Sequence, residues 1–83
     1  MLVLILFRSL TYAQKGKRAL ERGGVYASLI KAPLAVQSGG CAYALRLPGK
    51  KLERALALLQ ANGVDYKKVF EEDENGEYRE IVP

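Results

Sequence analysis

Among its 83 residues the chain has no histidine, no tryptophan and only one cysteine, Cys41. A lone cysteine cannot close an internal disulfide, so we expect a reducing, cytoplasmic location. Without histidine and with one thiol, the chain lacks the ligands of a structural zinc site, and we expect no metal and no cofactor. The lack of histidine also leaves Cys41 without the usual general base of a cysteine hydrolase.

Long apolar runs are also lacking. The opening "MLVLILF" holds seven residues, whereas a membrane span needs about 20. No basic stretch precedes this run and no small-residue cleavage site follows it, so we expect neither an export signal nor a membrane partner. A short continuous apolar run is typical of a strand buried on both faces.

Charge is unevenly distributed along the chain. Residues 1–54 hold 10 basic and 2 acidic side chains, a net of +8, and residues 55–83 hold 3 and 7, a net of −4. The basic part suits an anion, a nucleic acid or an acidic protein, or it is simply a solvated surface. Tyr26 and Tyr43 fall in expected strands, but no RNA-binding aromatic motif surrounds them, which argues against a nucleic-acid partner.

Apolar patterning and turn residues predict two helices and five strands. Residues 9–24 form a helix that Ser9 or Thr11 caps, with Thr11 and Gln14 fitting a capping box, and Leu10 joins its inner face. Residues 50–63 are the stronger helix, and Asn75 and Gly76 predict a two-residue hairpin turn. The expected strands cover residues 2–7, 25–31, 41–47 and 64–72, with a short fifth strand in 77–82.

This order predicts an α+β fold. We expect one domain over residues 1–83 with a ferredoxin-like βαββαβ sandwich, in which two helices cover one face of an antiparallel sheet. The right-handed crossover rule favours the strand order 4-1-3-2. The alternative is another small α+β topology with the C-terminal hairpin strand at a sheet edge.

Such a topology places Cys41 near the turn between the first strand and the first helix. A helix N-terminus attracts anions, including a thiolate. The side chains and backbone expected around Cys41 come from two strand ends, a helix start and a glycine pair: Arg8, Ser9, Thr11, Lys31, Gly39 and Gly40. From the residues alone, Cys41 is either a reactive thiol on a loop or a small buried side chain at a strand start.

Three segments carry a family resemblance: "FRSLTYA", "SLIKAP" and "SGGCAYALR". The chain resembles small bacterial proteins of the selenium/sulfur carrier-like family over roughly residues 2–70. That family often has glycine directly after the cysteine, where this chain has Ala42, and an arginine near the proline, which is missing here.

The resemblance implies that Cys41 carries sulfur or selenium as a persulfide or selenopersulfide. The implied partners are the proteins that donate and accept that atom. We expect a carrier or binding protein rather than a multiple-turnover enzyme. The alternative is a non-catalytic interaction module with a structural cysteine, which docks an acidic partner through Lys15, Lys17, Arg18 and Arg22. The second strand or the last strand could also form a homodimer by pairing at a sheet edge.

Overall fold

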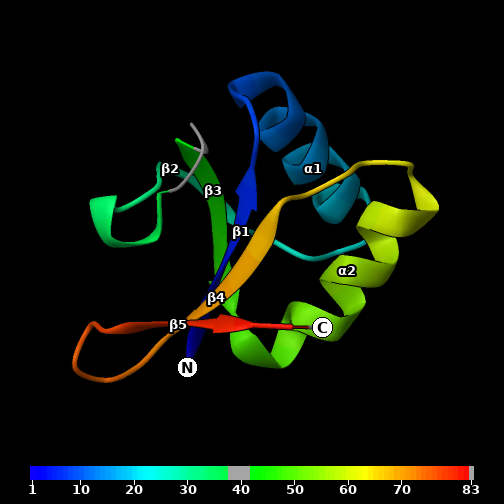
Figure 1. The fold of residues 1–83 in the computed structure, drawn as a ribbon. Helices are drawn as coiled ribbons and strands as arrows, with labels where there is room; N and C mark the ends of the chain where they lie inside the picture. The colour runs from blue at the N-terminus through cyan, green and yellow to red at the C-terminus, as the bar shows by residue number, and fades with distance from the viewer. Residues whose placement is uncertain (38–41, 83) are drawn as a thin grey trace.

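The computed structural model describes residues 1–37 and 42–82, which form a small α+β fold with two helices and a five-stranded antiparallel sheet (Figure 1). The helices and strands were all expected from the sequence, although several begin at different residues. In chain order the elements are β1 (Leu2–Phe7), α1 (Leu10–Arg22), β2 (Ser28–Lys31), the 3-10 turn η1 (Leu34–Val36), β3 (Tyr43–Pro48), the 3-10 turn η2 (Gly49–Lys51), α2 (Leu52–Ala61), β4 (Lys68–Glu72) and β5 (Tyr78–Ile81).

The strands lie in the order β2-β3-β1-β4-β5, and every neighbouring pair is antiparallel. The first four strands have the expected neighbours. β5 extends the sheet beyond β4, so the sheet differs from the four-stranded sheet of a simple βαββαβ unit. β1 lies at the centre, and Val3 to Phe7 have no exposed surface. This central position explains why the first strand is apolar at successive residues.

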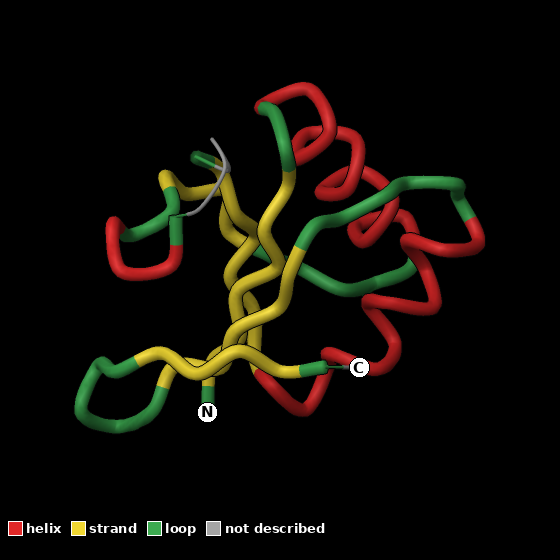
Figure 2. Tube along the Cα trace, viewed as in Figure 1, coloured by secondary structure: helices red, strands yellow, loops and turns green. Residues whose placement is uncertain are grey.

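Both helices pack on one face of the sheet, as Figures 1 and 2 show. Under them lies a core built from all the main elements, including Ile5 and Phe7 of β1, Leu20 of α1 and Leu59 of α2. The opposite face carries a second apolar cluster of Leu4, Leu6, Ala32, Val36 and Ala44, with Ile30, Phe70 and Tyr78 against it. Neither helix is long and apolar enough to cross a membrane in the part of the chain that the structure describes.

The strands β2 and β4 start later than expected, because the residues after each helix close a helix end instead. Val25 N–H donates to Leu20 O at 2.8 Å, and Val64 N–H donates to Leu59 O at 2.9 Å. Each valine follows a glycine with positive φ, Gly24 or Gly63. These are the contacts of a Schellman motif, in which the apolar residue after the glycine packs back on the helix. The two valines therefore end helices rather than begin strands.

The inner face of α1 also differs from the expected one at Leu10. Leu10 is 40% exposed, because it is the first residue of the helix and precedes the turns that lie over the sheet. Ala13, Gly16 and Leu20 are buried as expected. A Cβ at Gly16 would lie only 2.8 Å from Phe7 Cζ, so the missing side chain lets α1 approach the sheet closely.

Candidate functional site

Ser9 holds the start of α1, next to the end of β1. Its backbone is extended, and its Oγ accepts a hydrogen bond from Tyr12 N–H at 3.3 Å. This is the contact of an N-cap residue, which satisfies one of the free N–H groups of the first turn. The capping box at Thr11 is therefore wrong: Thr11 lies inside the first turn and is exposed. The Ser9 hydroxyl accepts a hydrogen bond from the helix backbone, so of the two hydroxyls that of Thr11 is the better candidate to bind a ligand.

Arg8 is held beside the same turn by an aromatic side chain that the sequence analysis did not single out. Its guanidinium lies 4.3 Å from the centroid of the Tyr12 ring and donates to the Tyr12 hydroxyl at 2.5 Å. Lys15 Nζ lies 5.6 Å from the same centroid. Aromatic rings attract cations at such distances. Arg8 precedes the extended N-cap Ser9, so the helical rule for residues four apart does not apply to this pair, and the sequence offered no specific signal for the contact.

Lys31 belongs to the same end of the sheet, through the register of three strands. Tyr43 of β3 pairs with Phe7 at the end of β1 and with Lys31 at the end of β2. Ala32 N–H donates to Ala42 O at 2.8 Å, which carries the β2–β3 ladder one residue further. The structure therefore brings Lys31 to the end of the sheet from which Arg8 and Ser9 lead into α1. Lys31 is exposed.

Three of the candidate residues, Gly39, Gly40 and Cys41, lie outside the described residues. The expectation that they meet the first turn of α1 stays a prediction. Of the other four, Arg8, Ser9 and Thr11 form one continuous turn, and Lys31 lies at the same sheet end.

The basic side chains of α1, expected as a docking surface for an acidic partner, are only partly paired in the structure. Lys17 pairs with Glu21 at 2.7 Å, whereas Lys15, Arg18 and Arg22 line a shallow groove with Asn62 and Val64.

Of the two tyrosines expected in strands, only Tyr43 lies in one. Tyr26 precedes β2 and is exposed, while Tyr43 lies on β3 and packs against the core beneath the helices. The tyrosines therefore do not make a shared stacking surface on the sheet.

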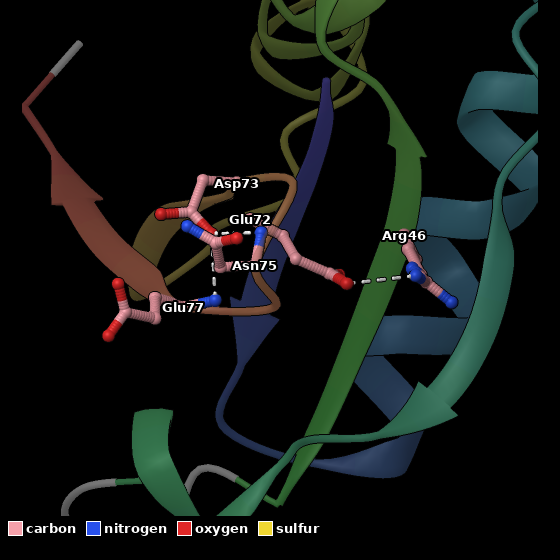
Figure 3. A network of polar contacts seen from close by, with 5 residues as sticks. All are labelled: Arg46, Glu72, Asp73, Asn75 and Glu77. Atoms are coloured by element: carbon pink, nitrogen blue, oxygen red, sulfur yellow. Dashed lines mark hydrogen bonds and ion pairs between the residues drawn. The ribbon is translucent and has the colours of Figure 1, made fainter.

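The β4–β5 loop at the opposite end of the sheet is acidic, and hydrogen bonds to one carboxylate hold it (Figure 3). Asp73 Oδ1 accepts hydrogen bonds from the N–H groups of Asn75 and Glu77, both at 2.9 Å. These contacts, with the positive φ of Gly76, close the β4–β5 hairpin predicted from Asn75 and Gly76, but the loop holds five residues, 73–77, rather than the expected two. The acidic run thus has a structural explanation as a hairpin loop.

A search of curated proteins and a search of solved structures each found no match. A family model matches residues 2–71, which include β1 to β3, both helices and nearly all of β4. The hairpin loop and β5 lie beyond the matched residues. Because the match spans most of the chain, the protein belongs to the family described as "Putative Se/S carrier protein-like".

Proposed function

We propose that the protein is a sulfur or selenium carrier that holds the transferred atom on Cys41. The observation that carries this proposal is the family match over residues 2–71, a range that includes the one thiol of the sequence. A thiol is the side chain on which sulfane sulfur can be held reversibly. With no second cysteine in the chain, a persulfide on Cys41 has no internal thiol to attack it and to release the atom as sulfide.

The transfer is a displacement at sulfur that needs no oxidant. The Cys41 thiolate attacks the terminal sulfur of a donor persulfide, the new Sγ–S bond forms, and the donor S–S bond breaks. The donor leaves as a thiolate, and Cys41 now carries the persulfide. An acceptor thiolate reverses the step and restores the Cys41 thiolate. Selenium follows the same sequence, with the donor's terminal selenium becoming a selenopersulfide on Cys41.

The surroundings proposed for Cys41 are those that favour a thiolate. The N-terminus of α1 offers free N–H groups and a partial positive charge, and Arg8 is held there by Tyr12. Lys31 adds a second cation at the same sheet end. Thr11 is available as a hydrogen-bond donor, and we assign Gly39 and Gly40 the role of letting the loop backbone approach the carried atom.

The proposal extends to the fold and the setting of the carrier. The order of β1 to β4 and the common side of the helices support a ferredoxin-like βαββαβ domain over residues 1–83, to which β5 is added. Its partners are the proteins that donate and accept the atom. A reducing cytoplasm is the compartment in which a single exchangeable thiol stays available.

Alkylation of Cys41 by iodoacetamide across a pH series tests the thiolate. We expect the rate to titrate below the ordinary thiol pKa of about 8.5. After treatment with a persulfide donor, intact-mass spectrometry should show one added sulfur, which dithiothreitol removes. The Cys41→Ser variant should gain none. A thiol that titrates at or above the ordinary value, or that gains no sulfur, would overturn the carrier.

A matched pair of lysine variants tests the proposed surroundings. Lys31 lies at the proposed thiol end, and Lys50 lies in η2 at the opposite end of the sheet. Lys31→Gln should raise the midpoint of the alkylation titration by a few tenths of a unit, because it removes a nearby positive charge. Lys50→Gln should leave it unchanged. Equal shifts in both variants would mean that Lys31 acts only through the overall charge.

A further inference from the structure

The outer edge of β2 carries backbone groups that point away from the sheet. The hydrogen bond from Ala32 to Ala42 fixes which residues face β3. Because these groups alternate along an antiparallel strand, Leu29 and Lys31 direct their N–H and C=O groups outward. A strand edge of this kind is a template for a further strand. The other edge of the sheet is β5.

Two strongly exposed apolar side chains bracket β2. Tyr26 is 75% exposed and lies four residues before Ile30, and Leu34 is 88% exposed and lies four residues after it. Single exposed apolar side chains are ordinary. Among the described residues, however, the other large apolar side chains that are exposed are at positions 1, 10 and 82, outside β2 and the residues that flank it in sequence. The two ends of the β2 edge therefore have apolar contacts to offer.

We propose that β2 pairs with β2 of a second copy of this chain, antiparallel and about a two-fold axis at Ile30. In this register Ile30 lies opposite Ile30 of the second copy. Leu29 lies opposite Lys31, so each such pair exchanges two backbone hydrogen bonds and the dimer gains four. An antiparallel arrangement also brings the start of one β2 to the end of the other, so Tyr26 of each copy meets Leu34 of the second copy.

Charge favours the β2 edge over the β5 edge. In the proposed register Lys31 faces an apolar residue and Ser28 faces Ala32, so no like charges are opposed. The two middle residues of β5 are Arg79 and Glu80. A two-fold pairing centred on either of them sets that charge against itself, which is destabilising. Charged side chains on an edge strand are a common protection against such pairing.

Sedimentation velocity over a dilution series of the full chain tests the dimer. We expect a reversible dimer whose population rises with concentration. The Tyr26→Ser/Leu34→Ser double variant should weaken association by about tenfold or more, since it removes apolar contacts from both ends of the interface. Both side chains are exposed, so the monomer should keep its circular dichroism spectrum and its thermal midpoint.

The matched control removes an exposed apolar side chain beside the other edge. Val82 is 87% exposed and follows β5, and Val82→Ser should leave the dimer unchanged. In a Cys41→Ser background, Ile30→Cys should give an interchain disulfide with oxidised glutathione, because directly opposed residues of this kind lie about 4.5 Å apart. Arg79→Cys in that background should give none. A wild type that stays monomeric at every concentration, or a dimer that Val82→Ser weakens as much as the double variant, would overturn the proposal.

Discussion

The two faces of the sheet are equally buried at their centre, but different elements cover them. Ile5 faces the helices, and Leu6 faces the other side, yet neither has any exposed surface. Over Ile5 lie two helices, each ended by a Schellman motif. On the face of Leu6, the apolar cluster includes Val36 of the short turn η1, and half-buried side chains of other strands, such as Ile30 and Phe70, pack against it. Burial of β1 therefore does not need two helical layers, because short segments can close a narrow face.

The kind of cover should decide how each face responds to lost volume. Two packed helices share many contacts and cannot easily move toward a cavity. A three-residue turn has few other contacts to give up and can move inward. The cost of a deleted side chain depends on how far its surroundings can collapse. The two faces should therefore differ in stability cost at equal burial.

The largest expected effect is the difference between Ile5→Ala and Leu6→Ala, which remove similar volumes from neighbouring residues. We expect Ile5→Ala to lower the free energy of unfolding by about 4–5 kcal/mol and Leu6→Ala by about 2–3 kcal/mol. Urea unfolding followed by circular dichroism measures both. If Ile5→Ala fails to fold, Ile5→Val, with an expected loss of about 1 kcal/mol, still allows the cost of lost volume at Ile5 to be measured. Equal costs on the two faces would contradict the comparison.

A smaller effect is expected at Gly16, where α1 comes closest to the sheet. Gly16→Ala improves helix propensity by about 1 kcal/mol, but its Cβ would meet the buried Phe7 ring. Overpacking of this kind costs about 1–3 kcal/mol, so we expect a net loss of about 1 kcal/mol. In the Phe7→Leu background the same change should be neutral or stabilising. If Gly16→Ala alone stabilises the protein, the face covered by the helices can also rearrange around a change in volume.

The smallest effect is expected on the other face, at the ion pair between β3 and β4. Arg46 Nη2 and Glu72 Oε2 lie 3.1 Å apart across β1, as Figure 3 shows. The side chains are 40% and 16% exposed, so we expect Glu72→Gln to cost less than about 1 kcal/mol, and less again in high salt. Glu80→Gln, which removes the more exposed pair with Lys68 at 3.7 Å, should cost still less. A larger loss at Glu80 would reverse this order.

Much of the fold followed from local sequence patterns. The apolar run of β1, the strong periodicity of α2 and the Asn75 and Gly76 turn each specify an element within a few residues of chain. The crossover rule then set the neighbours of β1 to β4. Two strand starts were wrong, at Val25 and Val64, where a β-branched residue after glycine looks like a strand start. Hydrogen bonds to the preceding helix, which depend on the glycine conformation, assign these valines to the helix ends.

The candidate site was predicted less completely. Ser9 and Lys31 could be placed because a helix start and strand ends follow from the topology. The contact between Arg8 and Tyr12 was missed, because Arg8 lies before the helix and an arginine at a strand end has many possible partners. The proposed roles of Cys41, Gly39 and Gly40 remain predictions, because these residues lie outside the described ones.

The sequence by itself determined the elements, the turn residues that separate them and the family, because these depend on neighbouring residues and short motifs. Only the tertiary structure decided what covers each face of β1 and which backbone groups of β2 point outward at the sheet edge. Those outcomes depend on pairing between residues far apart in the chain. Thus nothing in the sequence singles out Tyr26 and Leu34. They become candidate interface residues because both are exposed and because β2, which lies between them, directs backbone groups outward.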